Sequence, residues 1–464
     1  MQKKVKKINK LKGEVTIPAD KSISHRAVMF SSLAKGESRI ENFSKGADCH
    51  STLGVFKSLC VEAEFKDEKT LIIKSKGLIA PQTDLDCGNS GTTMRLMSGI
   101  LAGQNFDSVL MGDESLSKRP MARVIKPLEL MGAKISSNEN KAPLKIHGTD
   151  LIGIDYVSEL ASAQVKSCIL LAGLHARGKT SFTEPHVSRN HTELMLEYLG
   201  AKVGYEGTGK RKQQTGVENT PAPLEGEGWG GGQITSRTNL SPIHLFTCSP
   251  KVTIEKSQLQ AKTINIPGDI SSAAFFIVAA LIVPNSEIIL KNVGLNPTRT
   301  GILDVVKSMG ADIEILDEKV VSNELVGDIR VKYSDLKSCT IEGAIIPRLI
   351  DELPVIAVLA TQAQGTTIIK DAQDLRNKES DRIKAVVDEL KKLGANIEET
   401  PDGFIIEGKT DLRGAAQVET YHDHRLAMSL YVAGLVCENP ILINGFEWVN
   451  ISFPEFENLM NKLG

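Results

Sequence analysis

Basic and hydroxyl side chains gather at the starts of several apolar segments in this 464-residue chain. The start of a helix offers free backbone N–H groups and a partial positive charge, so Ser, Thr, Lys or Arg placed there can bind a phosphate or carboxylate. Residues in such positions are Lys21, Ser22 and Arg26; Asn89, Ser90, Gly91, Thr92 and Arg95; Ser162, Gln164 and Lys166; and Arg425. Several such starts converging on one cleft would bind a small polyanion.

Two basic turns add charge between these segments. They are SLSKRPMARV, from Ser115 to Val124, and LRNKESDRIKAV, from Leu375 to Val386. Taken alone, the alternating charges of the second turn are typical of a solvated, capped helix start. Its register with the other ligand-like starts favours a place in the same anion site.

The elements that must position these residues are six segments with a small polar start and an apolar body. They begin at Lys21, Asn89, Ser162, Asp269, Asp351 and Asp423. Ser, Asp and Asn are the expected N-caps, and bodies that are apolar all round predict buried helices. The pattern leaves open whether Asp351 is an N-cap, a catalytic base or both.

A helix-like segment that ends in a hydrophobic-Gly-Ala step recurs along the chain. Clear copies end at Ile135, Val203, Ile313 and Ile397, and weaker ones lie near Cys60 and Gly464. Glycine at a helix end can adopt the left-handed conformation that stops the helix, and the apolar alternation beyond it predicts a strand. The spacing indicates six units of roughly 70 residues, each built as β-α-β-α-β-β.

The third interval is longer than the others. Residues at about 206–250 are rich in Gly, Pro and Thr and lack a hydrophobic period, which predicts a loop insertion. Six units are too many for one sheet, so we predict an α/β protein of two lobes with three units each. The first lobe takes residues 20–264, with the insertion, and the second takes 1–19 and 265–464.

Charge, cysteine usage and hydropathy exclude several classes of protein. Lys plus Arg (55) nearly balance Asp plus Glu (57), which leaves no global field for nucleic acid or an anionic membrane. The seven cysteines are scattered and form no C-x-x-C pair, and the longest apolar run, Ala273 to Pro284, is too short to span a bilayer. We predict a soluble cytoplasmic protein without a cleaved leader. His422 and His424 have no further ligand nearby in sequence, so no metal site is predicted.

At the motifs named above and several others, the chain resembles the 5-enolpyruvylshikimate-3-phosphate synthase family over nearly its full length outside the insertion. The matching stretches, in family order, are DKSISHR (Asp20 to Arg26), DCGNSGTTMR (Asp86 to Arg95), GDESLSKRPM (Gly112 to Met121), SAQVKS (Ser162 to Ser167), SRNHTE (Ser188 to Glu193), PGDISSAAF (Pro267 to Phe275), NPTRTG (Asn296 to Gly301), LIDELP (Leu349 to Pro354), NKESDR (Asn377 to Arg382), DHR (Asp423 to Arg425) and SFPEF (Ser452 to Phe456).

The resemblance implies the two-lobed enolpyruvyl transferase fold with buried helices. It also implies transfer of the enolpyruvyl group of phosphoenolpyruvate to the 5-hydroxyl of shikimate-3-phosphate, with release of phosphate, on the route to chorismate and the aromatic amino acids. The expected partners are these two small molecules, with no cofactor, nucleic acid or membrane, and the expected state is a monomer.

Site residues follow from the resemblance position by position. The implied catalytic residues are Asp351, as base at the 5-hydroxyl, Glu379, as acid at the methylene carbon, and Lys21. Implied shikimate-3-phosphate ligands are Lys21, Ser22, Arg26, Ser162, Ala163, Gln164, Arg189, Asp351 and Lys378. Implied phosphoenolpyruvate ligands are Lys21, Gly91, Arg119, Gln164, Arg382 and Arg425.

The chemistry agrees with those roles. Phosphoenolpyruvate is a poor electrophile until its methylene carbon is protonated, so the site needs an acid at that carbon and a base at the attacking hydroxyl. Two carboxylates in different surroundings can serve, while the cations offset the phosphates and hold the reactants in line. Addition gives a tetrahedral intermediate, and elimination of phosphate gives the enol ether.

Two alternatives remain at the level of sequence. The related transferase acting on UDP-N-acetylglucosamine uses a reactive cysteine in a mobile loop, where this chain has SLSKRPM. A catalytically inactive relative that binds phosphorylated ligands would be expected to lose Asp351 or Glu379, which are present.

Two positions separate branches of the family. Ile451 precedes Ser452 where some members carry Lys, and Gly91 stands where a related branch often has Ala, which blocks glyphosate. We therefore expect glyphosate to compete with phosphoenolpyruvate.

Overall fold

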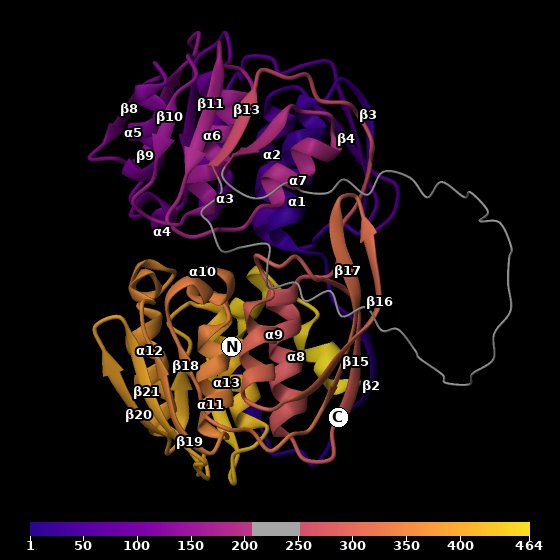
Figure 1. The fold of residues 1–464 in the computed structure, drawn as a ribbon, viewed down its shortest axis with the longest axis vertical. Helices are drawn as coiled ribbons and strands as arrows, with labels where there is room; N and C mark the ends of the chain where they lie inside the picture. Colours follow the sequence, from indigo (N-terminus) through magenta and orange to yellow (C-terminus); the bar gives the residue numbers. More distant parts are fainter. Residues whose placement is uncertain (207–250) are drawn as a thin grey trace, which may run out of the picture.

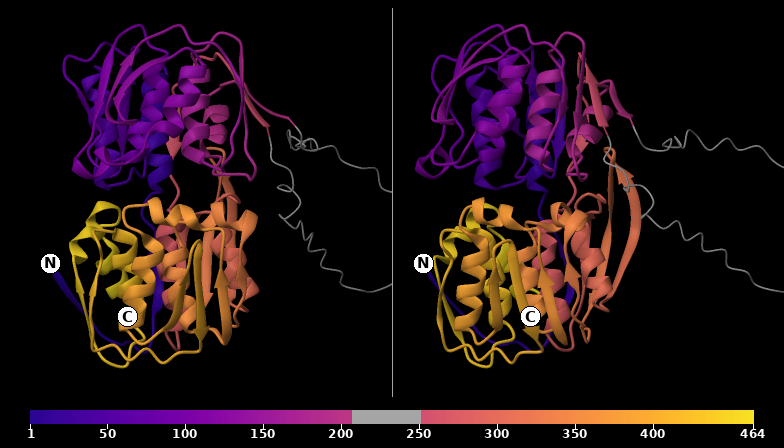
Figure 2. Two further views of the ribbon diagram at one scale, coloured as in Figure 1. Left: turned by 90° about the vertical axis from the view of Figure 1, so that its left-hand side faces the viewer. Right: turned by 60° about the vertical axis from the view of Figure 1, so that its left-hand side comes forward.

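The computed structural model describes residues 1–206 and 251–464 (Figure 1). These residues form two bodies stacked along the long axis of the molecule, and the turned views show the same separation (Figure 2). The loop insertion predicted at about 206–250 lies outside the described residues. In the described ranges, no helix is long and apolar enough to cross a membrane.

Six small sheets repeat one pairing pattern, in which a parallel pair is continued by antiparallel strands. In strand order, the upper sheets are β14 (Thr263–Asn265), β3 (Gly36–Glu41), β5 (Leu71–Ser75) and β4 (Glu62–Phe65); β6 (Leu85–Asp86), β7 (Ser108–Met111), β9 (Lys141–His147) and β8 (Lys134–Asn138); and β10 (Asp155–Val157), β11 (Lys179–Thr183), β13 (Lys251–Glu255) and β12 (Val203–Glu206). The lower sheets are β2 (Lys12–Thr16), β15 (Glu287–Gly294), β17 (Glu324–Lys332) and β16 (Asp312–Val321); β18 (Thr340–Ile341), β19 (Gly365–Ile369), β21 (Gly403–Gly408) and β20 (Asn396–Thr400); and β22 (Gln417–Glu419), β23 (Ile441–Asn444) and β1 (Gln2–Val5). The predicted α/β architecture of six repeated units is confirmed.

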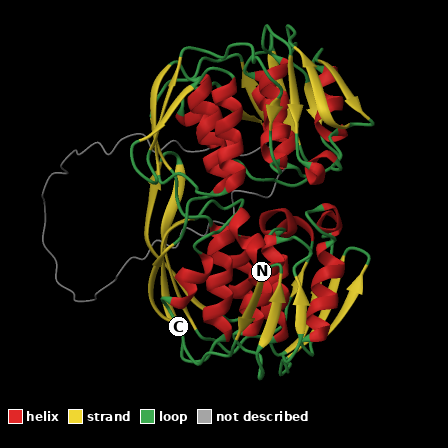
Figure 3. Ribbon diagram, turned by 180° about the vertical axis from the view of Figure 1, so that it is seen from behind, coloured by secondary structure: helices red, strands yellow, loops and turns green. Residues whose placement is uncertain are grey.

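Helices fill the interior of each body, with strands toward the outer faces (Figure 3). The buried helices are α1 (Lys21–Leu33), α3 (Gly91–Ala102), α6 (Ala163–Gly173), α8 (Ile270–Ile282), α11 (Leu353–Thr361) and α13 (His424–Gly434). The remaining helices are α2 (Ala47–Ser58), α4 (Glu114–Ser117), α5 (Ala122–Leu130), α7 (His191–Tyr198), α9 (Gly301–Ser308), α10 (Ile346–Leu349), α12 (Arg382–Lys392) and α14 (Phe456–Asn461), with short 3₁₀ turns η2 (Gly343–Ile345), η3 (Gln373–Asn377) and η4 (Phe446–Ile451). All 13 residues of α8 are buried, as expected of a helix that is apolar all round.

Polar residues cap most of the buried helices. The side chains of Asp20, Ser90, Ser162, Asp269 and Asp423 each accept a hydrogen bond from a backbone N–H of the first helical turn. Asp351 differs, because α11 begins only at Leu353 and its N-cap is Glu352, without a side-chain cap hydrogen bond. The expectation of an N-cap at Asp351 is therefore wrong, and its carboxylate is free for other contacts.

The glycines of the repeated Gly-Ala steps end their helices as predicted. Gly132, Gly200, Gly310 and Gly394 have φ between 91° and 97°, a region that residues with a Cβ rarely adopt. Each of these glycines lets the chain turn from an outer helix into the next strand.

The chain crosses between the two bodies at two adjacent segments. The backbone N–H of Asp20 donates to the carbonyl of Pro267 at 2.8 Å, and that of Asp269 donates to the carbonyl of Pro18 at 2.8 Å. β2 comes before the first crossing and pairs with β15 in the lower body. β14 lies between the two crossings and pairs with β3 in the upper body. Each body encloses its own hydrophobic core. We propose that these crossings divide the chain into the first lobe (20–264) and the second lobe (1–19 and 265–464).

Candidate active site

The starts of α3 and α6 are tied together in the first lobe. Arg95 Nη1 donates to Gln164 Oε1 at 2.8 Å, and Gln164 Nε2 donates to Thr92 Oγ1 at 3.2 Å. Arg119, from the turn after α4, donates through Nη2 to Asn89 Oδ1 at 2.8 Å. Within residues 1–206 and 251–464, the two guanidinium groups at this helix start thus have neutral hydrogen-bond partners.

Arg26 occupies the start of α1 and is buried. It donates to the carbonyl of Ser22 at 2.9 Å, to Thr192 Oγ1 at 2.7 Å and to Ser167 Oγ at 2.8 Å. These partners are also uncharged, so the positive charge of Arg26 is not neutralised by direct contact. Lys21 is the exception among these first-lobe cations, with Nζ at 3.0 Å from Asp48 Oδ2.

Carboxylates surround the cations of the second lobe. Arg382, at the start of α12 and only 2% exposed, lies 2.7 Å from Asp423 Oδ2, 2.7 Å from Glu379 Oε2 and 3.4 Å from Asp351 Oδ1. Lys378 Nζ is 3.5 Å from the same Asp351 oxygen. Asp351 and Glu379 are therefore held side by side on one guanidinium group.

Two ion pairs join the lobes at this site. Arg189 of the first lobe donates to Ser22 Oγ at 3.1 Å and pairs with Asp351 of the second. Arg123, in the first turn of α5, lies 3.1 Å from Asp374 of η3. Arg425 of α13 adds a hydrogen bond of 3.1 Å to the carbonyl of Asp351. The two groups of charged residues consequently face one another between the lobes.

Local charge keeps both candidate catalytic carboxylates ionised. Burial opposes ionisation of Asp351, but Lys378, Arg425 and Arg189 hold the pKa of this carboxyl well below its usual range. Burial likewise opposes ionisation of Glu379, and Arg382 outweighs it and holds the pKa of Glu379 far below the ordinary value. The site thus holds two ionised carboxylates among cations.

The first-lobe arginines are shifted in the opposite direction. Burial, and next the charge of Arg189, lower the pKa of Arg26 to about 10. Burial and the nearby Arg119 lower the pKa of Arg95 to about 10. Crowded cations without acidic partners are suited to binding anions such as phosphate.

Gly91 allows the arginines to approach the start of α3. A Cβ at this position would lie 2.9 Å from Arg95 Nη1 and 3.5 Å from Arg119 Nη1. A methyl group here would displace the end of a guanidinium group, so the size of residue 91 controls the space beside these cations.

The structure brings the sequence-predicted site residues to facing ends of the two lobes. They are Lys21, Ser22, Arg26, Gly91, Arg119, Ser162, Ala163, Gln164 and Arg189 in the first lobe, and Asp351, Lys378, Glu379, Arg382 and Arg425 in the second. The prediction that Lys166 is one of the anion-binding cations at a helix start is wrong. Its side chain is 2% exposed and pairs with Glu184 and Glu193.

Sequence reasoning missed several participants. Asp48 pairs with Lys21, and Asp423 supports Arg382 in addition to capping α13. Arg299 lies 3.6 Å from Asp269 and 4.0 Å from Asp351. Arg299 stands in the NPTRTG stretch, which was a signal, whereas nothing in the local pattern around Asp48 marks its partner.

The two histidines of the H-x-H pattern have different neighbours. The ring of His422 lies 4.6 Å from that of Trp448. His424 is buried, and its pKa is lowered to about 4 by burial and then by the charge of Lys21. Within residues 1–206 and 251–464, no group of three or more His, Cys, Asp or Glu side chains is arranged to hold a metal ion.

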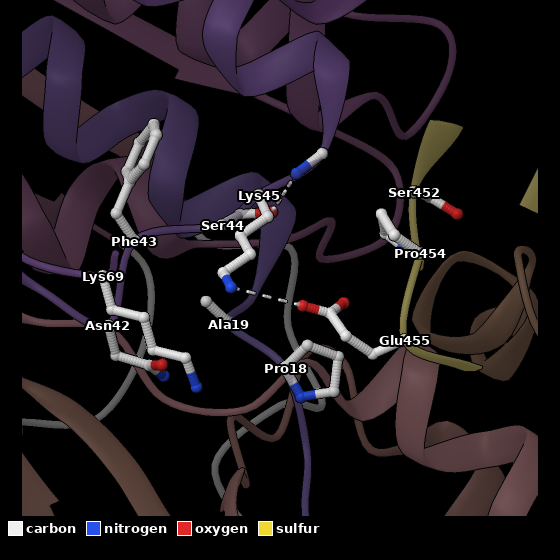
Figure 4. A pocket seen from close by; sticks show the side chains of 11 residues that line it. Pro18, Ala19, Asn42, Phe43, Ser44, Lys45, Lys69, Ser452, Pro454 and Glu455 are labelled. Carbon is white, nitrogen blue, oxygen red and sulfur yellow. Dashed lines mark hydrogen bonds and ion pairs between the residues drawn. The ribbon is translucent and has the colours of Figure 1, made fainter. Parts of the chain in front are cut away.

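A small pocket beside the lobe crossing is separate from this site (Figure 4). Its lining includes Pro18, Ala19 and Ser452. Lys45, which points toward Glu455 across it at 4.0 Å, also pairs with Glu68 at 2.7 Å. None of the predicted site residues lines this pocket, so it is not the candidate active site.

Comparison with protein families matches most of the chain to one model. Residues 5–226 and 245–460 match the family described as EPSP synthase (3-phosphoshikimate 1-carboxyvinyltransferase).

Individual relatives agree with that match. The 3-phosphoshikimate 1-carboxyvinyltransferase of Thermoanaerobacter sp. (strain X514) is 50% identical over 466 residues, covering all of both chains. The enzyme of the same name from Bacillus subtilis (strain 168) is 48% identical and covers 98% of each chain. Among solved structures, the EPSP synthase of Acinetobacter baumannii superimposes with a TM-score of 0.82 at 40% identity, over 100% of this chain and 98% of that one.

Proposed function

Because the chain belongs to the EPSP synthase family, we propose that the charged residues facing each other between its lobes carry out the reaction of that family. The chain transfers the enolpyruvyl group of phosphoenolpyruvate to the 5-hydroxyl of shikimate-3-phosphate and releases phosphate, in aromatic amino-acid biosynthesis. Neither the UDP-sugar acceptor nor an inactive relative is favoured by any observation.

Shikimate-3-phosphate is assigned to the first lobe. Ser22, Arg26 and Arg189 would hold its phosphate and hydroxyls, together with the start of α6 at Ser162, Ala163 and Gln164. The support is that Arg26 is buried and Arg189 partly buried, and that the first-lobe partners of both are hydroxyls and carbonyls. A phosphate would supply the negative charge that these partners lack.

Phosphoenolpyruvate is assigned to the space between the lobes. Arg119 and Gly91 contribute from the first lobe with Lys21 and Gln164, and Arg382 and Arg425 contribute from the second. Lys21 and Arg119 are among the charges that lower the pKa of Glu379, which supports a location of this carboxylate beside both sets of cations.

Asp351 and Glu379 are assigned to proton transfer, and the observation that carries this assignment is their shared contact with Arg382. Asp351, assisted by Lys378, accepts the proton of the 5-hydroxyl while the oxygen forms a bond to the central carbon of phosphoenolpyruvate. Glu379 delivers a proton to the methylene carbon. The Glu379 carboxylate then takes a proton back from the methyl group while the bond to phosphate breaks, and the enol ether and free phosphate result.

The charge of the substrates makes the acid role of Glu379 and the base role of Asp351 compatible with their low pKa values. Phosphate and carboxylate groups bound beside Glu379 offset Arg382, Lys21 and Arg119, so its pKa rises toward the value that an acid requires. The same anions offset the cations around Asp351 and make it a stronger base. Proton transfer is thus coupled to occupation of both substrate positions.

The test compares Asp351→Asn and Glu379→Gln with Asp388→Asn, an exposed α12 carboxylate that pairs only with Lys384 in the ion pairs of the described chain. We expect phosphate release with both substrates to fall by about 10²–10⁴-fold in the first two variants and to stay unchanged in the third. Full activity in either site variant would refute its assigned role.

We also propose that the protein is a cytoplasmic monomer. The site is assembled from the two lobes of one chain, and both substrates are small, water-soluble anions. Light scattering during gel filtration at micromolar concentration would detect a dimer and so contradict the second part of this proposal.

A further inference from the structure

Lys166 stands in the first turn of α6, two residues after Gln164, but its side chain is buried. Its Nζ lies 2.8 Å from Glu184 Oε1, 2.9 Å from Glu193 Oε1 and 3.1 Å from the carbonyl oxygen of Ser188. An ammonium group has three N–H donors, so each has an acceptor. Lys166 is therefore fully committed to protein contacts and cannot bind substrate.

The three acceptors belong to one segment of chain, residues 184–193, which joins β11 to the first turn of α7. Glu184 Oε1 also accepts a hydrogen bond of 2.9 Å from the backbone N–H of Ser188 and so closes the beginning of the segment into a loop. Lys166 consequently holds this segment at its beginning, its middle and its end.

Two residues next to those anchor points involve the arginines assigned to shikimate-3-phosphate: one is Arg189 itself, and the other, Thr192, contacts Arg26. Arg189 follows Ser188 directly and reaches Ser22 and Asp351. Thr192 precedes Glu193 and accepts the hydrogen bond from Arg26 Nε at 2.7 Å. A displacement of the segment would move Arg189 and remove a partner of Arg26.

The charge arrangement is costly for a purely structural element. The ammonium group of Lys166 pairs with two carboxylates, and all three side chains are 2% exposed or less. Within the described residues, Glu184 Oε2 and Glu193 Oε2 lack a hydrogen-bond partner. Apolar residues in place of such buried ion pairs are often neutral or stabilising, so the triad is better explained by position than by stability. Its net negative charge also lies near Arg26, where Glu193 favours the charged guanidinium.

We infer that Lys166 is a positioning residue for shikimate-3-phosphate, which fixes segment 184–193 and thereby sets the places of Arg189 and Arg26. This inference rests on the proposed function of those two arginines as ligands of that substrate.

The experiment measures kcat and the KM of each substrate for Lys166→Met and for the triple variant Lys166→Met/Glu184→Gln/Glu193→Gln. The triple variant removes all three charges and is used if the single variant, which leaves two unpaired carboxylates, does not fold. We expect the KM for shikimate-3-phosphate to rise about tenfold, which is ~1.4 kcal/mol of binding, while kcat and the KM for phosphoenolpyruvate stay within about threefold. Lys179→Met is the matched control, because that lysine is exposed on β11 and pairs with Glu206. Arg189→Gln is the benchmark and should raise the same KM.

Three outcomes would overturn the inference. The KM for shikimate-3-phosphate could be unchanged in a folded Lys166 variant while it rises as expected in Arg189→Gln. That result would show that Lys166 does not affect binding, and the assignment of the arginines would stand. A fall in kcat together with equal rises in the KM values of both substrates would assign Lys166 a structural role only. No effect in Arg189→Gln would refute the assignment of the arginines themselves, and the inference with it.

Discussion

The two halves of the active site hold their cations in different ways. In the first lobe, Arg26 and Arg95 are bound by hydroxyl, carbonyl and amide oxygens. In the second, Arg382 contacts Asp423, Glu379 and Asp351. The pKa of Arg382 is accordingly raised by Asp423 and Glu379 against the effect of burial, whereas burial lowers that of Arg26 to about 10.

This difference separates two tasks. Cations with neutral partners retain charge for incoming phosphate, and in the proposed function the first lobe serves mainly to bind substrate. Cations paired with carboxylates set the proton affinity of those carboxylates, and in the same proposal the second lobe serves mainly to move protons. Because the lobes face each other, anions held by one half would lie next to the carboxylates of the other.

The largest expected effect comes from removing the charge of each half in turn. Arg382→Gln leaves Asp351, Glu379 and Asp423 without their shared cation, and we expect the free energy of unfolding to fall by about 3–5 kcal/mol. Arg26→Gln removes hydrogen bonds to neutral groups and should cost about 1–3 kcal/mol. Urea unfolding of both variants measures the difference, and equal losses would contradict the contrast between the halves.

A buried histidine in each half gives a smaller, pH-dependent effect. Burial lowers the pKa of His25 in the first lobe to about 3 and that of His424 in the second to about 4, so both rings are neutral in the folded protein. The unfolded chain takes up these protons near pH 6.5. The stability that depends on a neutral ring is therefore complete above pH 6.5 and is lost as the pH falls toward the folded pKa.

The measurement compares the wild type with His25→Gln from pH 7.5 to 4.5. The stability difference between them should shift against the wild type by up to about 1.4 kcal/mol per pH unit below pH 6.5. A difference that is constant over this range would show that the pKa of His25 is the same in the folded and unfolded protein, and would contradict a neutral buried ring.

The smallest expected effect concerns the space beside the first-lobe cations. In Gly91→Ala, the new methyl group would push the Arg95 guanidinium, which lies 2.9 Å from the Cβ position. Because a single flexible side chain must move, we expect the KM for phosphoenolpyruvate to rise only a few-fold, by ~1 kcal/mol. Inhibition by glyphosate, tested in the same assay, should weaken more than substrate binding does.

Gly54→Ala on α2 is the control, since no atom lies within 4 Å of its Cβ position. The KM for shikimate-3-phosphate should stay unchanged in Gly91→Ala, because the atoms nearest the added methyl group belong to Arg95 and Arg119, which are not assigned to that substrate. A rise in that KM would show that the two anion positions are not independent.

Much of the fold could be predicted from local pattern. The apolar bodies that start at Lys21 and Asp269 are buried helices, and Gly132 and Gly394 end theirs in the left-handed region. Such features depend on the period of hydrophobic residues and on the conformational range of glycine, which act within one turn of chain.

Local sequence also places certain residues at helix starts, and so marks where anions can bind. Contacts between elements distant in the chain select which of these residues face the site. Lys166 and Gln164 share the start of α6, yet Glu184 and Glu193 draw Lys166 into the core while Gln164 reaches Arg95. Likewise, Asp351 is not a cap, because Arg189 and Arg382, distant in sequence, surround its carboxylate. The physical reason is that helix starts are set by neighbours along the chain, whereas the fate of a buried charge depends on counter-charges supplied by other elements.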